Sequence, residues 1–269
     1  MSDIKYSITV PVYNEKRDIL KFLETFELNK REDCECVIVD DSIDETPKII
    51  QNYIKERYGY KYVLNKKKGR CEARNLAIKL SKGKYVFIWN ADVLVPNNFF
   101  DQVDKYYEEK VDIVGFKNEI IEGNKYENYL KLFNETKYYN NFYEKKLSNN
   151  IISSTEGFMV KKELAIDAYP ENSFNPLVAG DDYIFARILE KRKVNYSFKI
   201  DFSIIIKHYM PDNFKEFYQN REGRGYGTPQ MKFYYGKKKL YRIFIYTNLK
   251  FIYSITKLML IPLSLNNYY

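Results

Sequence analysis

Side chains able to bind cations and move protons gather in short polar clusters, most of them directly after an apolar run. Three such clusters lie at 11–15, 40–44 and 90–92, and an acidic pair, Asp181 and Asp182, follows Gly180. Carboxylate and amide oxygens are ligands for hard divalent cations, and a carboxylate can act as a general base. The four clusters are therefore the first candidates for a functional site.

Apolar runs that alternate with helical stripes predict the elements that carry these clusters. The predicted strands are 7–12, 36–39, 60–64 and 85–89. The predicted helices begin after Asn14 as N-cap, at Thr46 and Pro47 as N-cap and N1, and near Ala73, and Gly83 is expected to end the last of them. Repeated βα units predict a mostly parallel, Rossmann-like α/β sheet with helices on both faces.

The sheet gives the polar clusters a common place. In doubly wound sheets ligands bind beyond the carboxyl ends of the strands, where the clusters at 11–15, 40–44 and 90–92 would converge. Such an edge suits a nucleotide and a metal better than a protein partner. The sequence lacks a G-x-G-x-x-G after the first strand and lacks a G-x-x-x-x-G-K-[ST], which counts against dinucleotide-dependent dehydrogenases and P-loop enzymes.

The second half of the chain is less regular. Strands are expected at 112–116, 155–160 and 204–207, a helix over the aromatic stretch 126–146, and another helix from Gly180 onward. From Leu240 acidic residues are absent, and two lysines and a proline interrupt the apolar tail, so it lacks the ~20 apolar residues of a spanning helix. This tail is either an interfacial membrane helix or a helix packed on the domain. The expected division is a catalytic domain at 1–210 and a basic, aromatic extension at 211–269, membrane-associated if the tail binds lipid.

Composition sets the compartment and the partners. The 269 residues carry 44 Lys+Arg and 36 Asp+Glu, a net charge of +8, but acids are interspersed and lysine runs at 66–68 and 237–239 are typical of solvated loops. No nucleic-acid partner is expected. Three cysteines and an N-terminus without a long apolar core predict a cytoplasmic protein, working at the inner face of the cell membrane if the tail binds lipid. Cys34 and Cys36 are expected on opposite faces of the sheet.

Five segments, in this order, resemble family 2 of the inverting, nucleotide-sugar-dependent glycosyltransferases, which have the GT-A fold. They are ITVPVYNE (8–15), VIVDDSIDET (37–46), GRCEARNLAI (69–78), GKYVFIWNAD (83–92) and GDD (180–182). The resemblance covers about the first 210 residues. The absence of a glycine after the paired aspartates is similar to the branch that loads sugars onto polyprenyl phosphates.

The resemblance implies a nucleotide site. It places Pro11, Tyr13 and Glu15 against the nucleoside, Asp40 and Asp41 near base and ribose, and Arg70 and Arg74 beside the nucleotide. Guanidinium groups can meet base edges or phosphate oxygens with several donors at once. Alternatives remain: Tyr13 as a core aromatic, Asp41 as a helix cap, and Arg74 as the partner of an internal carboxylate.

The resemblance also implies a divalent metal, Mn²⁺ or Mg²⁺. Asn90 and Asp92 match a D-x-D motif whose first residue meets the ribose and whose second binds the metal. Asn90 departs from the pattern and adds no charge, which lowers the expected metal affinity. His208 follows a strand where the family often has a metal or diphosphate ligand, although a lone histidine is more often structural.

In the family the second acid of a paired motif is the base, which makes Asp182 the expected catalytic base. Asp181 would orient an acceptor or raise the pKa of Asp182 by like-charge proximity. Both aspartates could instead be helix-capping residues. Arg221 and Arg224, in a glycine-rich stretch, would clamp the diphosphate or simply lie in a surface loop.

The expected function is transfer of a sugar from a UDP- or GDP-sugar to a glycan hydroxyl or a polyprenyl-linked phosphate, as in polysaccharide or glycolipid biosynthesis. A phosphate acceptor would need little base catalysis and would make Asp182 less important. The alternative is a non-catalytic nucleotide-sugar-binding or scaffold protein. RNA binding through the basic, aromatic surface would be a third class, but the sequence contains no recognisable RNA-binding motif.

Overall fold

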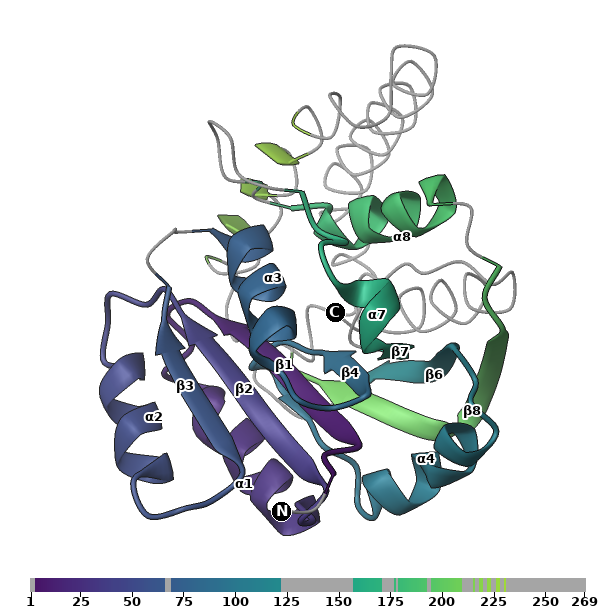
Figure 1. Ribbon diagram of the computed structural model, residues 1–269. Helices are drawn as coiled ribbons and strands as arrows, with labels where there is room; N and C mark the ends of the chain where they lie inside the picture. Colours follow the sequence, from purple (N-terminus) through teal and green to yellow (C-terminus); the bar gives the residue numbers. More distant parts are fainter. Residues whose placement is uncertain are drawn as a thin grey trace, which may run out of the picture.

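The computed structural model describes most of the first 209 residues (Figure 1). The described ranges are 3–65, 69–121, 157–170, 177, 179–192 and 195–209, with residues 215, 218, 219, 222, 223, 226, 227 and 230 beyond them. The expected helix at 126–146, Arg221, Arg224 and nearly all of the 211–269 extension lie outside the described residues. Among the helices described, none is long and apolar enough to cross a membrane.

One eight-stranded sheet organises these residues, in the order β3-β2-β1-β4-β7-β6-β8-β5. The strands are β1 (Tyr6–Val12), β2 (Cys34–Asp40), β3 (Tyr60–Leu64), β4 (Tyr85–Ile88), β5 (Val93–Leu94), β6 (Ile113–Ile120), β7 (Phe158–Lys161) and β8 (Phe198–His208). The helices are α1 (Ile19–Asn29), α2 (Thr46–Ile54), α3 (Arg70–Leu80), α4 (Phe99–Glu108), α7 (Lys162–Ala165) and α8 (Asp181–Lys191).

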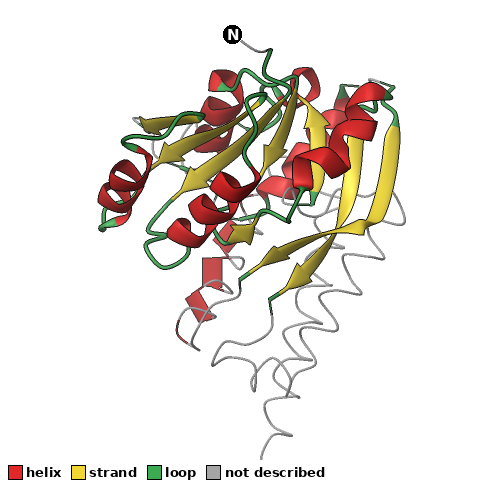
Figure 2. Cartoon of the chain, turned by 90° about the horizontal axis from the view of Figure 1, so that it is seen from below, coloured by secondary structure: helices red, strands yellow, loops and turns green. Residues whose placement is uncertain are grey.

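The sheet is mostly parallel, as the sequence predicts. The pairings β1–β2, β2–β3, β1–β4 and β6–β8 are parallel, whereas β7 runs antiparallel to β4 and β6, and β5 runs antiparallel to β8. Residues of α1, α2 and α4 pack against one face and residues of α3, α7 and α8 against the other. Figure 2 shows helices on both faces of the sheet. This confirms the predicted α/β architecture with helices on both faces.

Because side chains alternate along a strand, β2 contributes residues to the apolar cores on both faces of the sheet. Val37 and Val39 pack against α3, and Cys34, Cys36 and Ile38 pack into the opposite core with α1 and α4. Residues two apart in a strand share a face, so the expectation that the two cysteines lie on opposite faces is wrong. Because helices cover both faces, all seven residues of β2 are buried.

Two helix starts differ from the sequence-based expectation. α1 begins at Ile19 with Asp18 as N-cap, because Asn14 adopts a left-handed conformation with φ 57° and its Oδ1 accepts a hydrogen bond from Ile43 N. Asparagine tolerates this conformation and bonds neighbouring backbone, so it joins two loops instead of capping a helix. α2 begins one residue earlier than expected, at Thr46, with Glu45 as N-cap.

Gly83 does not end α3, which stops at Leu80. A Cβ on Gly83 would lie 2.6 Å from the backbone nitrogen of Ser7, so glycine is needed there for close approach of the chain to β1. This contact sets the path of the chain into β4 beside β1.

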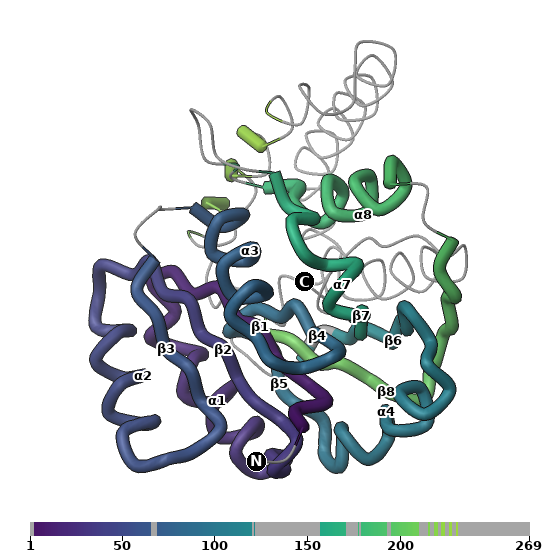
Figure 3. Tube along the Cα trace, viewed as in Figure 1, coloured from purple at the N-terminus to yellow at the C-terminus, as the bar shows by residue number. Residues whose placement is uncertain are grey.

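The later strands are longer than predicted or displaced. β6 runs on to Ile120, β7 ends at Lys161, and β8 spans 11 residues instead of the four expected. The β6–β8 register shifts between Phe116 and Lys117. The structure adds β5, α4 and α7, for which the sequence analysis has no element, and Figure 3 traces how β8 returns between β6 and β5.

Candidate active site

Asp40, at the end of β2, is used inside the protein. Its carboxylate accepts hydrogen bonds from Ser42 N at 2.7 Å and from the Tyr62 hydroxyl at 2.8 Å, and the residue is only 1% exposed. Both oxygens are thus occupied by the loop that follows β2 and by β3. Asp40 therefore lies at the expected edge of the sheet, but its carboxylate fixes the loop that contains Asp41.

Asp41 has one oxygen engaged and one open. Its Oδ2 accepts hydrogen bonds from Asn65 Nδ2 and from Gly69 N, both at 2.8 Å, which ties the end of β3 and the start of α3 to this residue. Its Oδ1 is buried and has no hydrogen-bond partner among the described residues. A buried carboxylate oxygen without a donor is costly, so this atom is suited to accept an N–H or O–H from a ligand.

Tyr13 and Ile43 are exposed apolar residues on the loops that follow β1 and β2, and Asp41 N joins these loops by donating to Val12 O at 2.9 Å. Tyr13 is 59% exposed, so it is not a core aromatic, and Ile43 is 74% exposed. Asn14 holds the two loops together because its N–H donates to Ser42 Oγ at 2.8 Å and its Oδ1 accepts from Ile43 N at 3.0 Å. Pro11 lies in β1, paired with Val39 of β2, two residues before Tyr13.

Asp92 comes close enough to Glu15 to influence the protonation of the Glu15 carboxyl. Burial, and then the charges of Asp92 and Asp18, raise the pKa of Glu15 to about 8 despite the opposing charges of Arg17 and Arg70. The carboxyl ends of β1 and β4 therefore bring these two acids to one place, where burial and like-charge proximity favour the neutral form of Glu15.

Arg74 links two of the predicted motifs. From α3 its Nε donates to Asp181 Oδ2 at 2.8 Å and its Nη2 donates to Asn90 Oδ1 at 2.9 Å. Arg74 is 1% exposed and Asp181 is 2% exposed. Of the two roles left open for Arg74, the structure shows the internal carboxylate. Arg70, 49% exposed on the preceding turn, lies 3.5 Å from Asp181 Oδ1 through its Nη1.

The two acids at the start of α8 differ in environment. Burial by itself would raise the pKa of Asp181, but the charges of Arg74 and Arg70 outweigh it and hold that pKa below its ordinary value. Asp182 is half-buried, so its side chain is partly accessible. Gly180, with φ 91°, makes the left-handed turn that starts the helix, a conformation suited to glycine.

Asp92 and His208 meet through the backbone. Tyr209 N donates to the carbonyl oxygen of Asp92 at 2.8 Å, and Val93 of β5 pairs with His208 at the end of β8. The family resemblance implies that both residues lie near the metal, but the two-residue β5 that joins them has no signal of its own in the sequence.

A divalent cation fits this edge only with help from its substrate. Among the described residues, no three His, Cys, Asp or Glu side chains gather into a metal-binding group. Mg²⁺ usually binds through one or two carboxylates and completes its shell with phosphate oxygens and water. Asp92 can supply the carboxylate of such a small ligand set and His208 lies next to it through the β5–β8 pairing, whereas the Oδ1 of Asn90 is bonded to Arg74.

Residues 7–167, more than half of the chain, match the profile described as "Glycosyl transferase family 2". The chain belongs to glycosyl transferase family 2. This agrees with the motif order, and it includes the polar clusters after β1, β2 and β4.

Relatives and solved structures agree with this membership. An uncharacterised glycosyltransferase of Rickettsia bellii is 29% identical over 109 residues, 40% of this chain and 16% of the relative. The structure of S. aureus TarS 1–349 in complex with UDP-GlcNAc matches with a TM-score of 0.59 at 16% sequence identity. The match covers 85% of this chain and 67% of the TarS chain. A Pyrobaculum calidifontis mannosyltransferase, in complex with GDP-Man and Mn²⁺, has a TM-score of 0.56 at 20% identity, covering 81% and 60%.

These likenesses identify the fold as GT-A. The chain spans only about a sixth of the length of the first curated relatives that it matches, so their full activities are not carried over to it.

Asn65, Gly69 and Tyr62 are the residues at this edge that sequence reasoning does not single out. Asn65 directly follows β3, so its position after a third strand is the signal that could have indicated it. The Tyr62 contact with Asp40 gives no signal in the sequence, because it depends on the pairing of β2 with β3.

Proposed function

We propose that this protein is an inverting glycosyltransferase that moves a sugar from a UDP- or GDP-sugar to an acceptor hydroxyl or a lipid-linked phosphate. The observation that carries the proposal is the joining, through Arg74, of the D-x-D-like loop at 90–92 to the acidic pair that starts α8. This brings a donor-side motif and an acceptor-side motif, far apart in the sequence, to one edge of the sheet.

The base and ribose of the donor would lie over Asp41. Its open Oδ1 would accept an N–H of the base or a ribose hydroxyl, and Tyr13, on the neighbouring loop after β1, would offer its exposed ring for stacking. Uracil and guanine both present N–H donors. The two structural neighbours were solved with UDP-GlcNAc and with GDP-Man, which supports testing both nucleotides here.

Asp182 would take the proton of the acceptor hydroxyl. The hydroxyl oxygen then bonds to the anomeric carbon from the face opposite the nucleotide, the bond from that carbon to the phosphate oxygen breaks, and the nucleoside diphosphate leaves with the electron pair. Because Asp181 is buried and neutralised by arginine, Asp182 is the carboxylate of this pair that is partly accessible.

Asp92 and His208 would hold a divalent cation together with the diphosphate. When bound, Mn²⁺ or Mg²⁺ would neutralise the charge that develops on the leaving diphosphate as a Lewis acid. The mannosyltransferase structure holds Mn²⁺ together with GDP-Man, which supports the choice of this metal for the first tests.

A thermal-shift screen of UDP- and GDP-sugars with Mn²⁺ or Mg²⁺ tests donor binding, because a ligand that binds only the native state raises the melting temperature. Asp182→Asn should then lose at least 100-fold in transfer while keeping donor binding. Asp92→Ala should lose the metal dependence of nucleotide binding. Asp167→Asn, an exposed acid outside the site, is the control.

Three results would oppose the proposal. Full turnover by Asp182→Asn would remove Asp182 as the base, and an identical calorimetric nucleotide affinity with and without Mn²⁺ would remove the metal. Failure to hydrolyse or transfer any sugar across a broad panel of donors and acceptors would count against the enzymatic function itself.

A further inference from the structure

Arg74 is the most deeply buried cation at the site and has an unusual pair of partners. Its guanidinium spans from Asp181, at the first position of α8, to Asn90, two residues before Asp92. Arginine has only donors, so the side-chain atom of Asn90 that faces it must be the carbonyl oxygen. The contact therefore fixes the orientation of the Asn90 amide as well as the start of α8.

A second set of contacts ties α3 to the same region. Asn75, next to Arg74, donates from Nδ2 to Tyr169 O at 3.0 Å and accepts from Tyr169 N at 3.3 Å. The centroid of the Tyr169 ring lies 5.1 Å from the centroid of the Phe185 ring in α8 and 5.5 Å from the guanidinium carbon of Arg74. α3 thus forms a common base on which α8 and the segment before it are seated.

We propose that Arg74 is a positioning residue: it sets the Asp182 carboxylate of α8 against the donor loop at 90–92, and it is not a ligand of the nucleotide. The inference rests on the proposed function for the role of Asp182. Arg74 is buried, and two of its donors already bond protein oxygens. Its guanidinium contacts the donor loop through Asn90 and the start of α8 through Asp181 at the same time.

The planar fork of arginine explains why lysine cannot replace it. A guanidinium can donate in two fixed directions from one rigid group, whereas an ammonium is a point charge on a flexible stem. Arg74→Lys would still balance the charge of Asp181 but would lose the fixed link to Asn90. A shift of about 1 Å in a reacting group can cost on the order of 100-fold in rate.

Four variants test the inference: Arg74→Lys, Arg74→Met, Asp181→Asn and the double variant Arg74→Met/Asp181→Asn, with Arg187→Lys as the control. Arg187 lies on α8 but pairs with Glu190, three residues along the same helix. The measurements are kcat, donor KM, the calorimetric Kd for UDP or GDP with Mn²⁺, and the melting temperature.

We expect Arg74→Lys to lower kcat by about 100-fold while Kd and donor KM stay within about twofold. Each neutral single variant leaves one buried charge without its partner and lowers the melting temperature, and the double variant recovers the melting temperature but not kcat. A crystal structure of the double variant should show the start of α8 displaced from residues 90–92. Arg187→Lys should keep wild-type kcat.

Two results would overturn the inference. A tenfold or greater rise in Kd and KM with unchanged kcat would make Arg74 a nucleotide ligand, and recovery of kcat in the double variant would reduce the pair to a structural role. If the wild-type protein transfers no sugar, the proposed function fails. The Kd of Arg74→Lys and the double-variant structure then still decide whether Arg74 binds nucleotide or positions α8.

Discussion

Asp40 and Asp41 are neighbours in the chain, but the structure gives them opposite tasks. Asp40 ends β2 and turns its two oxygens to Ser42 and Tyr62, whereas Asp41 keeps one oxygen without a partner among the described residues. Successive side chains in a strand point in opposite directions, which is consistent with Asp40 turning into the protein while Asp41, directly after β2, does not. The ligand-facing candidate is therefore Asp41 alone.

Asp41→Asn should weaken nucleotide binding by roughly 10- to 100-fold, the range expected when a hydrogen bond to a charged group is lost. The amide offers one oxygen where the carboxylate offers two, and Asn65 and Gly69 already need an acceptor. The measurement is the calorimetric Kd for UDP or GDP with Mn²⁺. Glu45→Gln changes the exposed N-cap residue of α2 and should leave that Kd unchanged. An unchanged Kd in Asp41→Asn would show that the nucleotide base and ribose do not bind at Asp41.

Helices and strands could be predicted where the periodic spacing of apolar residues marks each element within a short stretch of the chain. β1, β2 and β3 lie side by side in chain order and β4 pairs with β1 on its other side, and each of these strands and the helices between them carries a short-range apolar pattern of its own. The later strands pair with partners distant in the chain: β8 lies between β6 and the two-residue β5. The Arg74–Asp181 contact joins residues 107 positions apart, and local sequence patterns do not indicate such a pairing.

The turn at Ala179, just before α8, is in close backbone contact with Gly227. A Cβ on Gly227 would lie 2.5 Å from Ala179 O and 2.7 Å from Ala179 N, so Gly227 packs backbone to backbone against the turn that leads into Gly180. Distances this short cannot be relieved by rotating a side chain. Gly227 therefore belongs to the support of the acidic pair.

Gly227→Ala should lower kcat by about 10-fold or more, because the turn that presents Asp182 must shift. The melting temperature should change little, since the contact lies outside the main cores around the sheet. Steady-state kinetics and thermal unfolding measure the two effects. Gln219→Ala, at an exposed position nearby in the chain, should keep wild-type kcat; equal kcat in both variants would refute the supporting role of Gly227.

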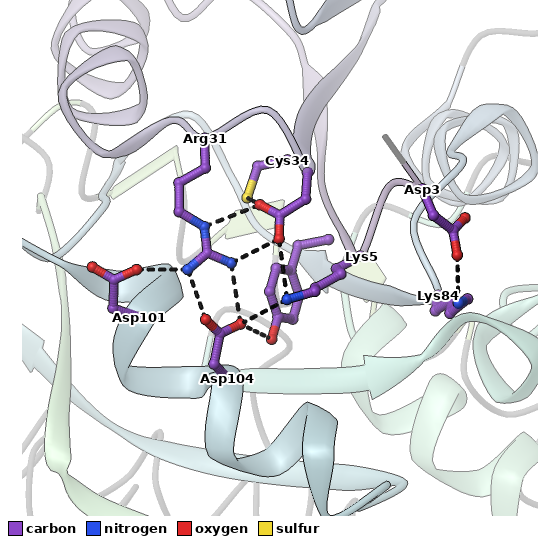
Figure 4. A network of polar contacts seen from close by, with 9 residues as sticks. Asp3, Lys5, Arg31, Cys34, Lys84, Asp101 and Asp104 are labelled. Carbon is purple, nitrogen blue, oxygen red and sulfur yellow. Dashed lines mark hydrogen bonds and ion pairs between the residues drawn. The ribbon is translucent and has the colours of Figure 1, made fainter. Parts of the chain in front are cut away.

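At the opposite, amino-terminal edge of the sheet, Arg31 joins elements that would otherwise only pack together. Its guanidinium donates to Asp33, beside β2, at 3.0 Å and to Asp101 and Asp104 of α4 at 2.6 and 2.8 Å (Figure 4). The Tyr6 hydroxyl of β1 donates to Asp104 at 2.8 Å. This network holds α4 to the sheet far from the proposed site.

Arg31→Met should lower the free energy of unfolding by about 1–3 kcal/mol, because several partly buried charge-assisted hydrogen bonds are lost. Chemical denaturation measures this change, and the nucleotide Kd should stay at its wild-type value. Lys84→Met removes the exposed ion pair with Asp3 in the same region and should have no measurable effect on stability. If both variants lost the same stability, the network would be no more than a surface feature.

Across the whole molecule, several carboxylates are held ionised by the fold. Burial alone would raise the pKa of Asp33 and Asp104, but hydrogen bonds from Arg31 lower it, and Lys161 and Ser197 do the same for Asp112. Asp33 and Asp112 directly precede β2 and β6, and Asp104, in α4, shares Arg31 with Asp33. The fold is therefore tied together by ionised acids at the edge opposite the proposed site, and its stability must depend on pH.

Asp201 tests this dependence most sharply. Burial would raise its pKa, but hydrogen bonds from Ser203, Tyr106 and Lys105 outweigh it and place the pKa far below the ordinary value. A carboxyl whose folded-state pKa lies below its unfolded value of about 3.9 contributes fully above roughly pH 5 and loses that contribution as the pH falls through the folded value. The wild-type melting temperature should therefore fall steeply below about pH 5.

Asp201→Asn should be less stable than wild type at pH 7, by about 1–3 kcal/mol, and its melting temperature should decline less steeply in acid, so that the two curves converge at low pH. The reason is that the amide cannot be protonated and has already lost the charge-assisted bonds. Asp167→Asn, which changes an exposed acid paired with Lys79, should keep the wild-type slope. Parallel curves for Asp201→Asn and wild type would show that Asp201 is not ionised by its partners in the folded protein, and would place the acid sensitivity in the Arg31 network and Asp112 instead.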